Sequence, residues 1–165
     1  MRREKCANCG TRAAVVRANY PFKESGLQVI LNGIEIIKCR KCGNEDPIIP
    51  RFEQLIRILA LAVIYKPYKL RGEEVRFLRH YLRMNGEEFS RLLHIDKTTL
   101  SKWENNEDRV GDQSDRLIRT IALGLGDGLK DELESAIRKF PKIRSANRKL
   151  TIRLDPETLS YRYAA

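Results

Sequence analysis

The sequence predicts an α+β multidomain chain: a small β module, then a mainly helical domain, and a short strand near the C-terminus. Three observations predict this class. All four cysteines lie in two Cys-x-x-Cys-Gly units, Cys6–Gly10 and Cys39–Gly43. The residues between the units are rich in β-branched and other apolar side chains. From residue 51 onward, apolar residues recur at helical spacing.

The segment between the cysteine units is predicted to be β structure. Residues 13–18 favour a strand, and residues 21–26 are rich in turn-forming side chains. Residues 27–31 and 34–38 are two further β-rich runs, separated by Asn32-Gly33. Because Asn-Gly is the strongest short-range hairpin signal, we expect a hairpin with its turn at these two residues. This hairpin would bring the ends of the cysteine units together.

A helix is expected over residues 51–66, directly after Pro50, a residue that suits a helix start. Its apolar side chains leave so little polar surface that it needs packing on most sides. A connecting helix buried between domains satisfies this requirement. A dimer contact or a partner-binding face is the alternative.

Further helices are expected after Pro67, at residues 72–84, 87–93, 97–104, about 114–125 and 129–140. Near the C-terminus, Leu150, Ile152 and Leu154 alternate with polar residues. This alternation is typical of a strand, which we expect to stop at Pro156.

The four cysteines, Cys6, Cys9, Cys39 and Cys42, have the spacing of a metal site. Two thiolates separated by two residues can lie on one tight turn, and a second such turn completes a tetrahedron around Zn²⁺. The glycine after each pair tolerates the positive φ of such a turn. Four thiolates fill the coordination shell, so we expect one structural zinc ion in a zinc-ribbon-like module.

Other uses of these cysteines fit less well. A thioredoxin-like redox motif would need a βαβ context, which neither pair has. Disulfides would need an oxidising compartment. An iron–sulfur cluster, another metal or unmetallated thiols remain as alternatives to zinc.

The formal net charge of +10 favours a polyanionic partner such as nucleic acid. The surplus is uneven, because residues 70–125 contain ten basic and ten acidic side chains. The segment 138–149 contains no acidic residue but six basic ones: Arg138, Lys139, Lys142, Arg144, Arg148 and Lys149. We expect an arm on a nucleic-acid backbone or in a minor groove, a solvated basic tail, or a contact for an acidic protein.

Residues 87–104 have the pattern of two short helices joined by the turn His94-Ile95-Asp96, as in a helix-turn-helix. Asp96 is expected to cap the second helix with its carboxylate. The second helix carries side chains suited to base edges and phosphates in a DNA major groove. The candidate DNA-binding residues are Lys97, Thr98, Thr99, Ser101, Lys102 and Asn105. A solvated helix face is the alternative.

This segment resembles the Cro/C1-type helix-turn-helix of phage repressors. The resemblance rests on Arg79, on Glu87-Glu88-Phe89-Ser90, and on residues 96–105, which read Asp-Lys-Thr-Thr-Leu-Ser-Lys-Trp-Glu-Asn. It implies a buried ion pair between Arg79 and Glu104, and a supporting position for Trp103 in the core.

Two positions depart from the family pattern. Gly86 stands where a Gln often contacts a phosphate, so one backbone contact is not expected here. His94 stands where the turn has a glycine, so it must adopt a left-handed conformation or shift the turn.

The cysteine module, the following helix and the helix-turn-helix together resemble the YgiT-type zinc finger proteins, including MqsA-type antitoxins. The resemblance covers about residues 1–125 and rests on domain order and motif spacing. It implies that the zinc module binds a toxin, usually a ribonuclease, and that the second domain dimerises and represses its operon. The segments expected are 1–48, the zinc module; 49–68, the connecting helix; 69–126, the DNA-binding domain; and 127–165, a helix, basic segment and strand for dimerisation or DNA contact.

We therefore expect an antitoxin-like, autoregulatory repressor that binds a palindromic operator as a homodimer. One recognition helix contacts too few base pairs for a specific site, which is why a dimer is expected. The helix 117–125 and the strand 150–154 are candidate dimer contacts. The alternatives are a free-standing regulator with a purely structural zinc module, or a protein- or RNA-interaction module.

No enzymatic activity is expected. The two histidines, His80 and His94, lie in helical context without a nucleophile–base pair, and the metal shell is full. No targeting signal is apparent, so we expect a cytoplasmic protein. The longest apolar run, within residues 58–65, is far shorter than the roughly 20 residues that span a bilayer.

Overall fold

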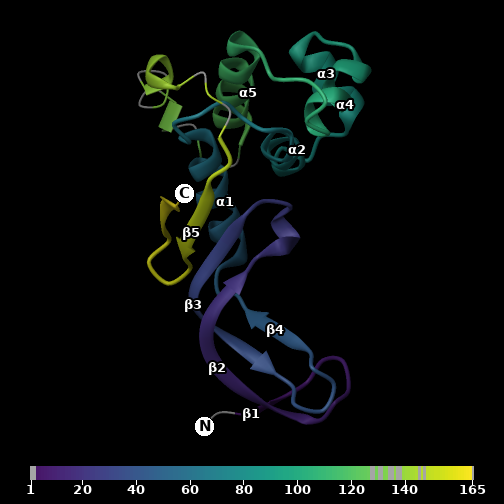
Figure 1. The fold of residues 1–165 in the computed structure, drawn as a ribbon, viewed down its shortest axis with the longest axis vertical. Helices are drawn as coiled ribbons and strands as arrows, with labels where there is room; N and C mark the ends of the chain where they lie inside the picture. The colour runs from purple at the N-terminus through teal and green to yellow at the C-terminus, as the bar shows by residue number, and fades with distance from the viewer. Residues whose placement is uncertain are drawn as a thin grey trace.

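In the residues that it describes, the computed structural model is α+β, with a mixed sheet of six strands and five α-helices (Figure 1). It describes residues 3–126, 129, 132, 133, 136, 139–144, 146 and 148–164. No helix within these residues is long and apolar enough to cross a membrane.

The strands and helices follow the expected order. The N-terminal strands are β1 (Arg3–Lys5), β2 (Arg12–Pro21), β3 (Val29–Lys38) and β4 (Glu45–Ile48). The helices are α1 (Phe52–Ile64), α2 (Gly72–Tyr81), α3 (Gly86–Leu93), α4 (Lys97–Glu104) and α5 (Asp112–Leu125). The short 3₁₀ helices η1 (Lys23–Ser25) and η3 (Phe140–Lys142) and the strands β5 (Thr151–Asp155) and β6 (Ser160–Ala164) complete the described elements.

The central strand of the sheet is β3. One of its edges pairs with β2, and the other edge is shared by β4 at Glu35–Lys38 and by β5, in parallel, at Val29–Leu31. The C-terminal strand expected from the sequence is therefore present and is followed by a second one, β6. Since β5 pairs with β3 and β6, it has no free edge for the expected pairing with a second copy.

The predicted hairpin at Asn32-Gly33 is wrong, because β3 runs straight through these residues. The register passes from Ala18 opposite Ile34 to Tyr20 opposite Leu31, so two residues of β3 bulge opposite Asn19. Gly33 has a φ of 60°, and its N–H donates to Asn19 Oδ1 at 3.0 Å. A bulge uses the same left-handed backbone as a tight turn, so the dipeptide signals both.

The chain reverses instead at residues 22–26, within the stretch that the sequence marked as turn-prone. Here η1 follows Phe22, and Gly26 adopts a left-handed φ of 70° with its N–H donating to Lys23 O at 2.9 Å. The hairpin therefore joins β2 to β3, two ten-residue strands, rather than two short ones.

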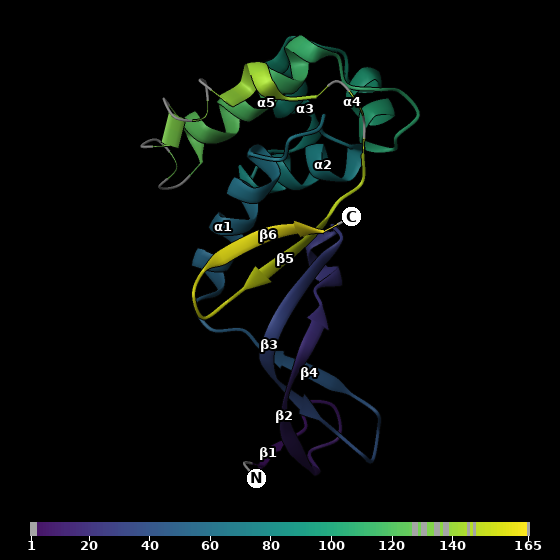
Figure 2. The ribbon, with the colours of Figure 1, turned by 60° about the vertical axis from the view of Figure 1, so that its left-hand side comes forward.

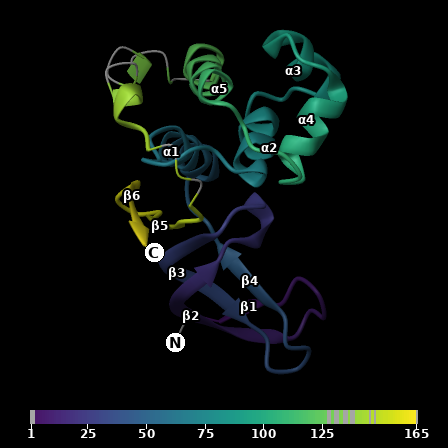
Figure 3. The same cartoon turned by 45° about the horizontal axis from the view of Figure 1, so that its top comes forward.

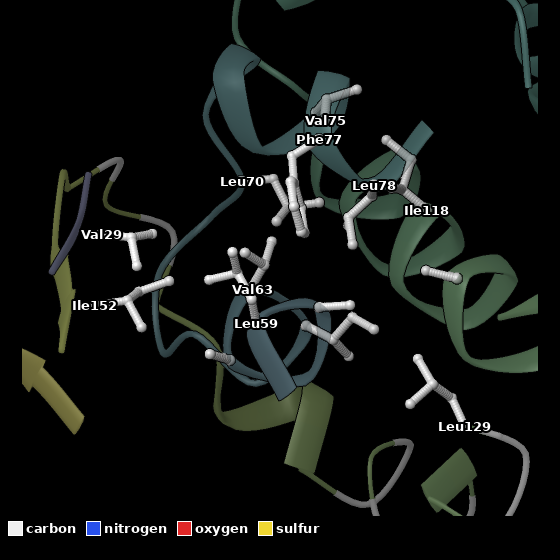
Figure 4. Close-up of a cluster of buried hydrophobic side chains, with 14 of the residues drawn as sticks. Val29, Leu59, Val63, Leu70, Val75, Phe77, Leu78, Ile118, Leu129 and Ile152 are labelled. Carbon is white, nitrogen blue, oxygen red and sulfur yellow. The ribbon is translucent and has the colours of Figure 1, made fainter. Parts of the chain in front are cut away.

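Helix α1 lies between the sheet and the other helices (Figure 2). Figure 4 shows Leu59 and Val63 of α1 with Val29 and Ile152 of the sheet on one side and apolar side chains of α2 and α5 on the other. Tyr163 of β6 donates its hydroxyl to Ala62 O at 2.6 Å. Six side chains of α1 are buried, and one continuous apolar core runs from the sheet to α5.

A fully buried guanidinium, that of Arg119 on α5, fixes the end of α1. It donates to the carbonyl oxygens of Lys66 at 3.1 Å and Tyr68 at 2.7 Å, and also to those of Val63 and Ile64. Asp115, one turn earlier, accepts from Arg119 Nε at 2.8 Å and from Leu70 N at 2.6 Å. These bonds satisfy carbonyls that a helix end leaves without partners.

A second buried ion pair, Lys66 with Glu74, links the same connection to α2. Glu74 also accepts from Arg71 N at 2.7 Å, which completes the first turn of α2. Burial lowers the pKa of the Lys66 ammonium and raises the pKa of the Glu74 carboxyl, whereas each partner's charge acts in the opposite direction.

Two of the helices expected from the sequence, at residues 72–84 and 129–140, do not match the described elements in full. Helix α2 ends at Tyr81 rather than near Met84, because Arg83 turns left-handed with a φ of 56°. The helix expected at 129–140 falls largely outside the described residues.

Gly72 opens α2 at the point where the end of α4 approaches it. A Cβ at this position would lie 2.2 Å from Trp103 O and 2.7 Å from Glu104 O, both backbone atoms. We predict that Gly72→Ala lowers the free energy of unfolding by about 1–3 kcal/mol, as overpacking does elsewhere. Urea denaturation measures this change.

Gly124→Ala is the matched control, because a Cβ within α5 at this position meets nothing within 4 Å. Alanine there should raise the free energy of unfolding by about 0.5–1 kcal/mol. A Gly72→Ala variant as stable as the wild type would contradict the close approach of α2 and α4.

Candidate metal centre and candidate nucleic-acid interface

The two cysteine turns have the same geometry. In the first, Gly10 N donates to Cys6 O at 2.9 Å; in the second, Gly43 N donates to Cys39 O at 3.0 Å. Both glycines are left-handed, with φ values of 68° and 74°. The glycine that follows each pair is therefore required by the backbone, as the sequence predicted.

The four sulfur atoms converge at the end of the sheet distant from α5. All lie within 4.8 Å of one another, and the pairs Cys6–Cys42 and Cys9–Cys39 are each 3.5 Å apart. A tetrahedral ion with metal–sulfur bonds near 2.3 Å would set the sulfur atoms about 3.8 Å apart. The four side chains can therefore hold one metal ion.

The surroundings shift the pKa values of two cysteines in opposite directions: the pKa of Cys42 is raised, and that of Cys9 is lowered. Hydrogen bonds from the side chain and backbone of Thr11 lower the pKa of the Cys9 thiol to about 6. Cys6 and Cys39 are buried with Ala13 in a small cluster of their own, apart from the main core. Because so few apolar side chains hold this end together, it depends on its cysteines.

Helices α3 and α4 are joined by the three residues that the sequence marked as a turn. Asn85 and Glu88 form a capping box at the start of α3, with both reciprocal bonds at 2.9 Å. His94 adopts a φ of 55°, so this position has the left-handed conformation, the first of the two options that the sequence left open. Asp96 occupies the N-cap of α4, but its exposed side chain makes no capping hydrogen bond, so that prediction is wrong.

One face of α4 is exposed and polar, and the opposite face is buried. Leu100 and Trp103 pack into the core. Thr99 is half-buried, and the other candidate DNA-binding residues are exposed: Lys97, Thr98, Ser101, Lys102 and Asn105. These five share one face, because residues one turn apart on a helix are neighbours.

Three of the exposed side chains already have partners. Lys97 Nζ lies 2.7 Å from Glu87 Oε2, and this contact lowers the pKa of the Glu87 carboxyl. Asn105 Oδ1 accepts from Arg76 at 2.9 Å, and Asn105 Nδ2 donates to Ser101 Oγ at 3.4 Å. Thr98 and Lys102 make no ion pair or side-chain hydrogen bond with the part of the chain that the structure describes.

The ion pair expected between Arg79 and Glu104 is present. Arg79 Nε and Nη2 lie 2.7 and 3.1 Å from the two carboxylate oxygens, and both side chains are about nine-tenths buried. Arg79 also donates to Met84 O at 3.0 Å. A two-pronged contact of this kind ties the end of α4 to α2 in one orientation.

Sequence reasoning missed two residues that strengthen this junction. Arg76 donates to Glu104 O at 2.9 Å, and Asn106 Oδ1 accepts from Gly72 N at 2.9 Å. The spacing of Arg76 and Arg79, one helical turn apart, was the available signal for a shared partner.

No protein-family model, curated protein or solved structure matches this chain.

We predict that the chain binds one metal ion and that Cys39→Ser abolishes this binding. The measurement is the metal content per chain, by elemental analysis and native mass spectrometry. The helical circular dichroism of Cys39→Ser should persist, because the main core does not include the cysteine cluster.

Ser25→Ala, a substitution in the turn at the other end of the hairpin, serves as the control and should retain the metal. Full metal content in Cys39→Ser would contradict a four-thiolate site.

Proposed function

We propose that this protein is a sequence-specific DNA-binding repressor that places α4 in the major groove of duplex DNA and regulates its own transcription. The observation that carries the proposal is the exposed face of α4. It presents Thr98 and Lys102 without partners among the described residues, on a short helix joined to α3 by a three-residue turn. Lys donates to guanine edges or phosphates, and Thr contacts thymine methyl groups or acceptors.

The rigid attachment of α4 supports this proposal. Glu104 and the carbonyl that follows it are held by Arg76 and Arg79 of α2, while Leu100 and Trp103 are buried. A recognition element fixed before binding loses little conformational freedom when it meets DNA. The resemblance to Cro/C1-type domains is in agreement with this arrangement.

The proposed repressor acts as a symmetric dimer through α5. Leu117 and Leu125 are 44% and 55% exposed, and the half-exposed Ile121 lies between them at the same four-residue spacing. An apolar stripe of this kind can pack against its own copy about a two-fold axis. Two α4 helices would then contact two half-sites.

The proposed metal is a single zinc ion with a structural role. Four thiolates form a soft ligand set suited to Zn²⁺, and they leave no open coordination position for a substrate. When bound, the ion would hold the two cysteine turns together. The expected ribonuclease toxin as a partner of this module remains a prediction that rests on the resemblance alone.

Selection from a pool of random duplexes tests the proposed function. The metal-loaded chain should enrich an inverted repeat with half-sites about 10 base pairs apart, the spacing of one DNA turn. The same repeat should occur upstream of its own coding sequence. A pool with no enriched sequence would refute sequence-specific binding.

The Thr98→Ala/Lys102→Ala variant should bind the enriched duplex at least about 30-fold more weakly, since each of the two lost base contacts is worth about 1–3 kcal/mol. Fluorescence anisotropy at fixed salt measures the dissociation constant. Arg162→Ala, which removes one exposed charge from β6, is the control and should leave the affinity unchanged. Equal affinity of the double variant and the wild type would exclude the face of α4.

The Leu117→Ser/Leu125→Ser variant should be monomeric in sedimentation equilibrium, because it makes the α5 stripe polar. Because both side chains are exposed in the single chain, the two substitutions should have little effect on the stability of the folded monomer, as measured by its thermal midpoint. Affinity should fall on the full inverted repeat and persist on a single half-site. A dimeric variant would show that the interface lies elsewhere.

A further inference from the structure

A cationic surface lies outside α4, on the segment that runs from Lys139 through η3 to the residue before Leu150. We name as the basic ridge its described basic residues: Lys139, Lys142, Arg144, Arg148 and Lys149. All five are exposed, and no acidic residue occurs between positions 139 and 149. Within the described part of the chain, none of the five forms an ion pair.

The ridge is anchored to the body of the protein. Phe140 is buried in the main core, and Ile143 packs against it. Arg144 N donates to Pro67 O at 3.0 Å, and Arg144 forms an isolated β-bridge with Tyr68. The segment is therefore held along the connection between α1 and α2.

Two tyrosines of that connection orient the cations. The guanidinium carbons of Arg144 and Arg148 lie 5.7 and 5.5 Å from the centre of the Tyr68 ring, and Lys139 Nζ lies 4.6 Å from that of Tyr65. Arg144 also donates to the Tyr68 hydroxyl at 3.3 Å. A cation over an aromatic ring is oriented but keeps its charge, so the ridge remains available to an anion.

The helical region around α4 has no surplus of basic over acidic side chains. Residues 70–125 contain equal numbers of acidic and basic side chains, and Lys97 of α4 is paired with Glu87. The affinity of proteins for duplex DNA depends strongly on the phosphates that lysine and arginine neutralise. The proposed function therefore requires phosphate contacts from another part of the chain.

We infer that the basic ridge binds the phosphate backbone of the duplex whose major groove α4 contacts, outside the half-site. This inference rests on the proposed function. Figures 1 and 3 show the η3 end of the ridge segment and α4 on opposite sides of α5, at the same end of the molecule. From there the segment returns to the start of α2, where Lys149 lines a small cleft with Glu73 and Glu74. A duplex that lies across this end presents the same groove again after one turn, about 34 Å. Its phosphate backbone would therefore pass the ridge beyond the base pairs that α4 contacts.

The test compares two matched double variants on the enriched inverted repeat. Lys142→Gln/Lys149→Gln neutralises two ridge cations that form no ion pair, side-chain hydrogen bond or ring contact with described residues. The control, called the sheet variant, is Lys23→Gln/Arg162→Gln, which neutralises one exposed cation on η1, in the β2–β3 connection, and one on β6. Each protein is titrated from 50 to 200 mM salt, on a duplex that ends at the half-sites and on one extended by two turns on each side.

On the extended duplex, the ridge variant should bind at least several-fold more weakly. Its salt slope should be smaller than that of the wild type by about 0.9 for each lost phosphate contact. The sequence preference should be unchanged, and on the short duplex the variant should match the wild type. The sheet variant should match the wild type on both duplexes, and both variants should keep the wild-type thermal midpoint.

Two results would overturn the inference. A wild-type slope on the extended duplex shows that the ridge touches no phosphate, and an equal loss on both duplexes places the contact inside the half-site. Failure of the proposed function is distinguishable from these results. It appears as a wild-type chain without sequence preference, whereas failure of the ridge leaves that preference intact.

Discussion

The arrangement of this protein depends on a buried guanidinium. Arg119 donates to four carbonyl oxygens at the end of α1 and in the residues that follow it, and Asp115 balances its charge while accepting from Leu70. Without Arg119 the carbonyls and Asp115 would be buried without partners, and breaking such a pair costs about 3–5 kcal/mol elsewhere. The geometry of these bonds defines the direction in which the chain leaves α1. The direction of the chain after α1 sets the position of α2 relative to α1, which packs on the sheet. Because α4 is attached to α2, the same direction also sets the position of α4.

Features that depend on neighbours in the sequence were predictable. The Cys-x-x-Cys-Gly units have backbone requirements that local spacing expresses, and the four sulfur atoms converge as predicted. Helix α1 was recognisable because its apolar residues cover most of its circumference, and α3 and α4 because a short turn separates two amphipathic segments. The Arg79–Glu104 contact was accessible only through the resemblance, since residues 25 apart have no local signature.

Features that depend on distant parts of the chain were not predictable in the same way. Asn32-Gly33 suits either a tight turn or a bulge, and the long pairing of β2 with β3 decides between them. Nothing near residue 152 indicates that β5 lies parallel to β3. In the sequence Arg119 is one of many cations, and its four-residue spacing from Asp115 is equally typical of a surface pair. Burial is a property of the packed structure, and it distinguishes these cases.

The functional account joins a fixed recognition helix, a dimer stripe on α5 and a metal centre that holds the far end of the sheet. Its central claim is that α4 contacts base edges in a major groove. Dimethyl sulfate footprinting tests this most directly, because the reagent methylates guanine N7 in the major groove and adenine N3 in the minor groove. On the enriched duplex the account predicts protection of guanine N7 in both half-sites, lost when Thr98 and Lys102 become alanine. Protection confined to adenine N3, or none at all with the protein bound, would contradict it.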